Sequence, residues 1–254
     1  LLKDAAFFYQ VPAYVMRLDH LVHSYVHLRQ PETLGYGYEQ VYAHLIATLH
    51  SQADSISSLF IGGGGYVLPR YLAVRYPQAR SVVSEIDPGV TEVNKTDLAL
   101  PTTASIETKN LDARMYLLRT SSEKPFDFVF GDAFNDFSVP YHLTTLEFHE
   151  LLKSRMSQDG VYALNIIDDA RYGNFLTAMV KTLNVVWKNV YVAPGAAEFA
   201  KGRNTIVLIA TDRVLDEVAW KTVISPAAQA GKIEENEYRR LTQLLPSPAV
   251  EAFL

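Results

Sequence analysis

Acidic side chains follow three separate apolar segments of this 254-residue sequence, and together they could bind a nucleoside and act on it. Glu85, Asp112 and Asp132 each stand at or just after the end of such a segment. If the segments are parallel strands, their carboxyl ends meet at one edge of a sheet, where the three side chains converge. A carboxylate there can accept hydrogen bonds from ribose hydroxyls or an exocyclic amine, or take a proton from a reacting group. One such residue alone is more often a helix cap or a turn residue, so the prediction depends on all three.

A run of four glycines follows the first apolar segment and indicates a backbone that approaches a ligand closely. The run consists of Gly62, Gly63, Gly64 and Gly65. Without Cβ atoms these residues let the chain turn sharply, while the free N–H groups of the next helix face the ligand. Glu85 comes about twenty residues later, the distance at which an acidic residue binds ribose in a nucleoside-binding βαβ unit.

The glycine run does not fit the two common phosphate-binding motifs. In the dinucleotide fingerprint G-x-G-x-x-G/A, the last position would hold Val67 or Leu68, depending on the register. No Gly-Lys-Ser/Thr of a phosphate-binding loop follows either. The pattern therefore favours a nucleoside with few phosphates, such as S-adenosylmethionine or a related ligand, over NAD or ATP.

Apolar segments alternate with helical ones from about residue 59, which predicts the scaffold that positions these side chains. The expected strands are Leu59–Ile61, Ser81–Ile86, Ser105–Thr108, Phe126–Gly131, Gly160–Ile167, Val190–Val192 and Thr205–Ala210. Helices are expected after the glycines, from Pro88, after Asp112, and over 144–156 and 171–186. Such alternation predicts an α/β fold with a doubly wound, mainly parallel sheet, whose ligands bind outside the carboxyl ends of the strands.

The sequence before residue 51 is expected to form a small β appendage joined to the main domain by a helix. Residues 7–28 are rich in aromatic and branched side chains, which predicts two or three antiparallel strands with a turn at 18–20. Helical spacing runs from Tyr38 to about Gln52. We therefore expect an N-terminal region, 1–50, and a nucleoside-binding catalytic domain, 51–254, whose last segment, 212–254, reads as helical and polar.

Three histidines, His20, His23 and His27, lie in the predicted N-terminal strands and raise the question of a metal site. On a strand, positions 20 and 23 face opposite ways, and no carboxylate or thiolate stands at a ligand spacing. We interpret them as half-buried strand histidines and expect no metal ion.

The composition describes a folded globule with a mildly acidic balance. Hydrophobic residues make up 48% of the chain and charged residues 20%. The formal net charge of −5 argues against a general nucleic-acid binder, which needs basic stripes. The absence of cysteine excludes disulfides, thiolate zinc sites and cysteine nucleophiles. No stretch approaches the ~18 consecutive apolar residues that a membrane-spanning helix needs.

Several segments together resemble the spermidine synthase family of polyamine aminopropyltransferases. The matching motifs are Ile-Gly-Gly-Gly-Gly, Ser-Glu-Ile-Asp, Leu-Asp-Ala and Phe-Gly-Asp-Ala-Phe, followed by Val-Pro-Tyr-His-Leu-Thr-Thr-Leu-Glu-Phe. Segments 9–10, 17–24 and 38–44 are similar to that family's N-terminal β domain and its junction, so the resemblance reaches to about Ala210. It implies a Rossmann-like fold of the class I S-adenosylmethionine-dependent methyltransferase type.

The resemblance is closest to a branch whose members are often joined to a transporter-like membrane region. Because the chain begins without methionine, we expect it to be a soluble domain of a larger membrane protein. The resemblance also implies a homodimer and a cytoplasmic location, or the cytoplasmic face of the membrane.

For donor binding, the resemblance implies that Glu85 holds the ribose and Asp112 the adenine amine. The full donor-binding set that it implies is Gly62, Gly63, Gly64, Gly65, Glu85, Ile86, Asp112, Ala113, Gln10 and His23. Two of these depart from the family, because His23 stands where the family usually has glutamine, and Gly65 stands where an aspartate binds the aminopropyl ammonium. The expected co-substrate is therefore either decarboxylated S-adenosylmethionine or S-adenosylmethionine itself.

For catalysis, the resemblance implies that Asp132 orients and deprotonates an attacking amine, while Tyr38 lines the acceptor pocket. Asp136 would be the second aspartate of the family's acidic loop, although its spacing from Asp132 is longer by one residue. The acceptor implied is a polyamine such as putrescine.

Several reactions remain open from the sequence alone. The leading hypothesis is attack on the three-carbon arm of the sulfonium, which releases methylthioadenosine. A variant is attack by the donor's own carboxylate in intact S-adenosylmethionine, which would release methylthioadenosine and a lactone. A methyltransferase would share the glycine loop and ribose glutamate but would leave S-adenosylhomocysteine. A nucleoside-sensing or scaffold domain is the non-enzymatic alternative.

Overall fold

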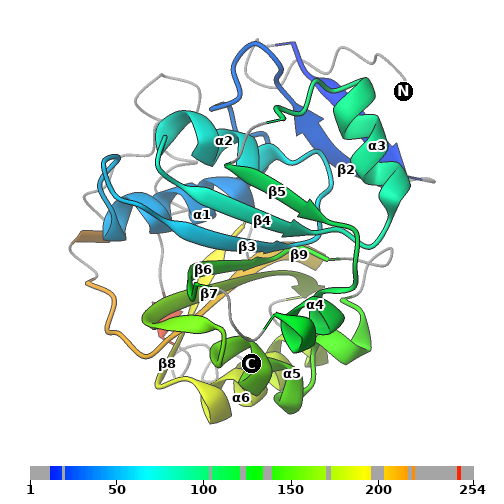
Figure 1. The fold of residues 1–254 in the computed structure, drawn as a ribbon. Helices are drawn as coiled ribbons and strands as arrows, with labels where there is room; N and C mark the ends of the chain where they lie inside the picture. Colours follow the sequence, from blue (N-terminus) through cyan, green and yellow to red (C-terminus); the bar gives the residue numbers. More distant parts are fainter. Residues whose placement is uncertain are drawn as a thin grey trace.

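A central sheet with helices on both faces and a separate two-stranded hairpin make up the fold (Figure 1). The computed structural model describes residues 12–18, 21–102, 105–120, 124–133, 139–169, 173–195, 203–216, 219–220 and 245–246. Gln10, His20 and Asp136, which the sequence pattern singled out, lie outside these residues, as does most of the segment 212–254.

The central sheet is mostly parallel. Its strands, in the order in which they lie side by side, are β10 (Leu245–Pro246), β8 (Asn189–Pro194), β9 (Arg203–Thr211), β7 (Met156–Asp169), β6 (Phe126–Gly131), β3 (Ser57–Ile61), β4 (Arg80–Ser84) and β5 (Ile106–Lys109). The strands from β7 to β5 are parallel to one another, whereas β9 is antiparallel to both of its neighbours. Burial on both faces explains why the inner strands read as nearly continuous apolar runs.

The order of the strands reverses between β3 and β6. From β3 the chain proceeds to β4 and β5 on one side, and it then returns to form β6 and β7 on the other side. Doubly wound sheets bind their ligands outside the carboxyl ends of the strands at such a switch point. Gly62 and Asp132 are the first residues after β3 and β6, so the topology brings these two residues together.

Helices cover both faces of the sheet (Figure 1). On one face lie α1 (Gly37–Leu49), α2 (Val67–Arg75) and α3 (Pro88–Thr96); on the other lie α4 (Ala113–Arg119), the 3-10 helix η1 (Tyr141–Leu143), α5 (Leu146–Lys153) and α6 (Asn174–Val186). Successive strand residues alternate between two apolar cores, because side chains on a strand point to opposite faces. Phe60 packs with α1 and α2, for example, whereas its neighbours Leu59 and Ile61 pack with α4 to α6.

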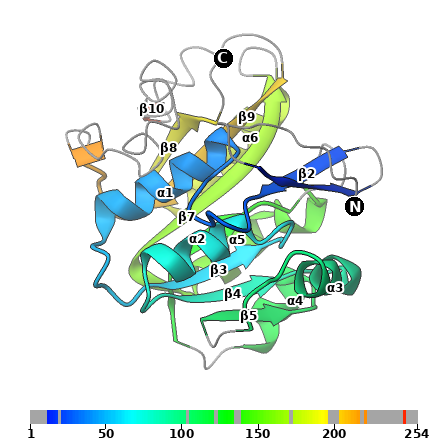
Figure 2. The same ribbon diagram turned by 90° about the horizontal axis from the view of Figure 1, so that it is seen from above.

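The N-terminal hairpin consists of β1 (Tyr14–Leu18) and β2 (Leu21–Val26), which pair antiparallel. It lies at the carboxyl ends of the parallel strands (Figure 2), where the Ser24 Oγ accepts a hydrogen bond of 2.8 Å from the backbone N–H of Gly65. The predicted antiparallel strands and the linking helix are therefore confirmed, although α1 ends at Leu49 rather than near Gln52. The helix packs into the same core as the sheet, and the division of the chain at residue 50 stays a prediction.

The predicted α/β class and sheet are confirmed, but some boundaries were wrong. The helix predicted over 144–156 is shorter, because the Thr145 side chain caps α5 and the chain from Met156 onward already pairs with β6. The helix predicted from residue 171 begins at Asn174. The helical prediction for 212–254 was wrong at 245–246, where the backbone pairs antiparallel with β8 instead.

Candidate functional site

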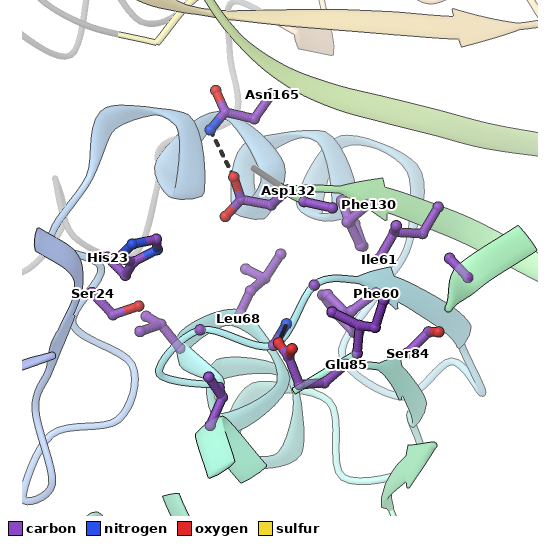
Figure 3. A pocket seen from close by; sticks show the side chains of 18 of the residues that line it. His23, Ser24, Phe60, Ile61, Leu68, Ser84, Glu85, Phe130, Asp132 and Asn165 are labelled. Atoms are coloured by element: carbon purple, nitrogen blue, oxygen red, sulfur yellow. Dashed lines mark hydrogen bonds between the residues drawn. The ribbon is translucent and has the colours of Figure 1, made fainter. Parts of the chain in front are cut away.

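A cavity of about 440 Å³ opens at the switch point, between the ends of the strands and the N-terminal hairpin. Figure 3 shows Glu85 and Asp132 on opposite sides of this space, with His23 and Ser24 of β2 on a third side. Pockets that bind small molecules measure ~300–1,000 Å³, so the cavity is large enough for a nucleoside with a short extension.

The glycine bend forms the floor of the cavity and requires glycine at its first position. Gly62 has φ of +99°, and a Cβ atom there would lie 2.6 Å from the carbonyl oxygen of Asp132. The side chain of Asn94 holds the bend from below, since its Nδ2 donates to the carbonyl oxygen of Gly64 at 2.7 Å. Backbone atoms of the bend, rather than side chains, therefore line this part of the cavity.

Glu85 lies across the bend and is bound by backbone groups. Its Oε2 accepts a hydrogen bond from the N–H of Gly63 at 2.7 Å, and its Oε1 accepts one from the N–H of Asp87 at 2.8 Å. The residue is 7% exposed and lines the cavity. Each carboxylate oxygen has a second lone pair, so Glu85 is fixed in place and can still accept hydrogen bonds from a ligand.

Asp112 stands at the end of the cavity that the sequence assigns to the base. Its Oδ1 caps α4 by accepting the N–H of Met115 at 3.0 Å, and its Oδ2 lies 2.7 Å from the Nε2 of His142. The role of helix cap, which the sequence left open, is thus confirmed. The predicted neighbours Ile86 and Ala113 line the same end, and Ile86 is 68% exposed there, as an apolar surface for a flat base would be.

Asp132 is held by two side chains from different elements. The Tyr38 hydroxyl on α1 donates to Oδ2 at 2.7 Å, and the Asn165 amide on β7 donates to Oδ1 at 2.8 Å. Burial raises the pKa of Asp132 to about 6, although both hydrogen bonds act in the opposite direction. A carboxylate with a pKa near neutrality is suited to accept a proton during a reaction.

Glu39 is a second buried carboxyl group that lines the cavity. It is 4% exposed, and its Oε2 accepts the backbone N–H of Tyr36 at 3.0 Å in a capping box at the start of α1. Burial raises the pKa of Glu39 to about 8, and the charge of Asp132 contributes to this rise. The rings of Tyr36 and Tyr38 stack beside it with centroids 5.6 Å apart. An acidic and aromatic wall of this kind suits a cationic ligand.

Gly65 does not lie where the sequence pattern placed it. Gly62, Gly63 and Gly64 line the cavity, but Gly65 faces the hairpin. A Cβ atom at Gly65 would lie 2.5 Å from the Val26 Cγ2 and 2.8 Å from the Ser24 Cβ. The expectation that a side chain at position 65 would face the donor, and so would decide between the two donors, is therefore not supported by this backbone.

Glu39, His142 and Asn165 are among the polar cavity residues that sequence reasoning missed as site residues. Asn165 is the one polar residue in the apolar run Val161–Ile167, and that interruption is a signal that could have revealed it. Glu39 and His142 carry weaker signals, because a glutamate in the first turn of a helix and a histidine in a loop are common on protein surfaces.

Within the described part of the chain, no group of three or more histidine, aspartate or glutamate side chains is arranged to hold a metal ion. Among the same residues, no helix combines the length and apolar character needed to cross a membrane.

The fold is shared with solved structures of spermidine synthases. A probable spermidine synthase from Corynebacterium glutamicum superimposes with a TM-score of 0.78 over 96% of this chain and 87% of that protein, at 21% sequence identity. A spermidine synthase in complex with the transition state analogue AdoDATO gives a TM-score of 0.57 over 94% of this chain and 75% of that protein, at 17% identity. At these identities the likeness establishes the fold.

A curated relative adds sequence similarity to the shared fold. The polyamine aminopropyltransferase of Vibrio vulnificus is 32% identical over 114 residues, which cover 44% of this chain and 38% of that protein. No protein-family model matches the chain. The match spans less than two fifths of that relative's length, and together with the shared fold it makes the chain similar to the spermidine synthase family, the polyamine aminopropyltransferases.

Proposed function

We propose that this protein transfers the three-carbon arm of a sulfonium nucleoside to an amine and releases methylthioadenosine. The observation that carries the proposal is the meeting of two carboxylates at one glycine bend. Glu85 binds the N–H of Gly63, while the backbone of Asp132 packs against Gly62, and both residues line the same cavity. One carboxylate is thus placed to bind a ribose and the other to act on a group next to it.

The residues present fit a nucleoside in the donor position. Gly62 to Gly64 offer backbone without side chains, Glu85 offers carboxylate lone pairs, and Ile86 offers an exposed apolar surface. The donor supplies a sulfonium, whose attached carbons are already activated towards a nucleophile. We propose decarboxylated S-adenosylmethionine as the donor, because the Asp132 and Glu85 carboxylates line the cavity and S-adenosylmethionine brings a further carboxylate into it.

Asp132 would act on the amine. A free amine has a pKa of ~10 and arrives protonated, so a base must take a proton before or as the C–N bond forms. With its pKa raised by burial to about 6, Asp132 is mostly ionised at neutral pH and can accept that proton on Oδ1 or Oδ2. The C–S bond breaks as the C–N bond forms, and the electron pair stays on the sulfur of methylthioadenosine.

The acceptor end of the cavity would lie along α1 and the hairpin. Tyr38 and Glu39 line it from α1, Tyr36 from the residue before that helix, and His23 from β2. We propose a polyamine such as putrescine as the acceptor. We also propose that region 1–50 contributes residues to the acceptor end of the site, whereas region 51–254 binds the donor. Homodimer formation, a cytoplasmic location and the link to a transporter-like region stay predictions from the resemblance.

Identification of the nucleoside product tests the proposal. Purified protein is incubated with decarboxylated S-adenosylmethionine or with S-adenosylmethionine, each with and without putrescine, and the products are separated by chromatography. We expect methylthioadenosine and spermidine only from the decarboxylated donor with putrescine, and neither from the Asp132→Asn variant. S-adenosylhomocysteine would indicate methyl transfer, and methylthioadenosine with a lactone would indicate cyclisation; either result would overturn the proposal.

A further inference from the structure

We propose that Asn165 is a positioning residue for Asp132: its side-chain amide fixes the orientation of the Asp132 carboxylate and favours the ionised form that accepts a proton. The inference rests on the proposed function, in which Asp132 is the base. Asn165 lies on β7, the strand next to β6, and in the register of the two strands Gly131 pairs with Leu164. Asn165 therefore stands one residue further along, beside Asp132.

The two hydrogen bonds to Asp132 come from side chains on different elements, α1 and β7. The Asn165 Nδ2 donates to Oδ1 at 2.8 Å, and the Tyr38 hydroxyl donates to Oδ2 at 2.7 Å. Figure 3 shows the first of these bonds, with the amide approaching Asp132 from β7. One donor on each oxygen fixes the plane of the carboxylate, so its remaining lone pairs keep a constant direction towards the cavity.

The Asn165 side-chain amide also favours the ionised form of Asp132. A hydrogen bond donated to a carboxylate stabilises the ionised form more than the protonated form, and it opposes the effect of burial. Other titratable groups line the same cavity: Tyr36 before α1, Tyr38, Glu39 and Tyr42 on α1, His23 on β2, Glu85 and Asp87 after β4, Asp112 before α4, and His142 on η1. None of them supplies a permanent positive charge, so the neutral donors carry most of the stabilisation of the Asp132 anion within the described residues.

The side-chain oxygen of Asn165 argues against a purely structural role for this residue. Asn165 is 3% exposed, and its Oδ1 is buried without a hydrogen-bond partner in the described part of the protein. A buried oxygen without a partner destabilises a fold, whereas an apolar side chain of similar size would not carry this cost. Stability therefore does not explain an asparagine at this position, but its contact with Asp132 does.

Titration of Asp132 in the free protein tests the inference without any substrate. Side-chain carboxyl carbons of aspartate are labelled with carbon-13, and the Asp132 signal is assigned by its loss in Asp132→Asn. Loss of one hydrogen bond to the carboxylate in Asn165→Leu is expected to raise the midpoint of the Asp132 titration by about one to two pH units. Asn165→Gln keeps the amide, so the midpoint of the Asp132 titration is expected to rise less than in Asn165→Leu. It serves as the second variant if the leucine variant does not fold.

A matched control uses an asparagine that binds backbone far from the cavity. The Asn189 amide on β8 donates to the carbonyl oxygen of Arg213 at 3.1 Å, so Asn189→Leu should leave the Asp132 titration unchanged. An unchanged midpoint in both folded Asn165 variants would overturn the inference, and so would an equal shift in the Asn189 variant.

The pH dependence of turnover then separates the inference from the proposed function. In Asn165→Leu, the acid limb of kcat/KM should move to higher pH by the same one to two units, which lowers kcat/KM at pH 7 about two- to tenfold, while donor affinity stays unchanged. A shifted Asp132 titration with no aminopropyl transfer by the wild-type protein would contradict the proposed function alone. A shifted titration with an unmoved acid limb would contradict the positioning role in catalysis.

Discussion

The carboxylates at the two ends of the cavity are held by different kinds of partner. At the nucleoside end, both Glu85 oxygens accept backbone N–H groups, those of Gly63 and Asp87. At the proposed amine end, the hydrogen-bond donors to Asp132 among the described residues are side chains, a hydroxyl on α1 and an amide on β7. Burial raises the pKa of Asp132 to about 6.

In the proposed function, this difference separates a group that binds the donor from a group that reacts. Backbone donors are part of the glycine bend and of the start of α3, so they hold Glu85 as a permanent hydrogen-bond acceptor. Side-chain donors from two separate elements orient the Asp132 carboxylate and favour its ionised form, which suits a group that accepts a proton. We therefore expect changes at Glu85 to alter donor affinity and changes at Asp132 to alter rate.

Asp132→Asn should have the largest effect on rate. A general base contributes ~10²–10⁴-fold, so the single-turnover rate with saturating donor should fall by about this factor. Donor affinity, measured by calorimetry with methylthioadenosine, should stay within about threefold of wild type. A fall in affinity as large as the fall in rate would mean that Asp132 belongs to the binding end.

Glu85→Gln should produce the converse result. A hydrogen bond to a charged group contributes ~1.5–3 kcal/mol, so the dissociation constant for methylthioadenosine should rise roughly 10- to 150-fold. The rate at saturating donor should change much less. Glu92→Gln on the exposed side of α3 is the matched control and should leave both quantities unchanged. Unaltered affinity in Glu85→Gln would remove Glu85 from the ribose site.

Tyr38→Phe should have a smaller effect, because Asp132 keeps the second of its two donors. We expect a roughly tenfold lower kcat/KM at pH 7 and an acid limb that moves to higher pH. Tyr36→Phe is the control, since the Tyr36 hydroxyl donates to the carbonyl oxygen of Val22 at 3.2 Å and not to Asp132. An acid limb that moves equally in both variants would show that the Tyr38 hydroxyl has no specific role.

The smallest expected effect is on stability, and its sign follows from the pKa of Asp132. The pKa is raised from 3.8 to about 6 in the folded protein, so folding favours the protonated form and stability falls as pH rises between these values. Asp132→Asn should therefore raise the free energy of unfolding at pH 7 by ~1–3 kcal/mol, and the gain should disappear near pH 4. Urea denaturation at both pH values measures this; a loss of stability at pH 7 would contradict the assigned sign.

The fold and the three strand-end carboxylates were predictable because they depend on local patterns. Apolar runs, a glycine cluster and acidic residues at strand ends are all visible in the chain, and the parallel topology then brings Glu85 and Asp132 to one cavity. The contact between Asp132 and Asn165 was not predictable in the same way, since it depends on the register between β6 and β7. No local pattern encodes that register.

The side-chain direction at Gly65 shows a second limit of sequence reasoning. The family pattern places a carboxylate at this position, but here its Cβ direction is occupied by Val26 and Ser24 of the hairpin. The hairpin is distant in sequence, so the glycine run alone does not reveal this contact. The boundaries of α5 were missed for a different reason, because the cap at Thr145 and the early start of β7 compete with a continuous helical pattern.

The most direct test of the division between the two ends is the single-turnover release of methylthioadenosine as a function of donor concentration. This experiment yields the donor dissociation constant and the maximal rate together, for the wild-type protein, Asp132→Asn and Glu85→Gln. We predict that the first variant loses rate and keeps affinity, and that the second loses affinity and keeps most of its rate. If both variants lose rate and affinity in the same proportion, the two carboxylates do not have separate roles.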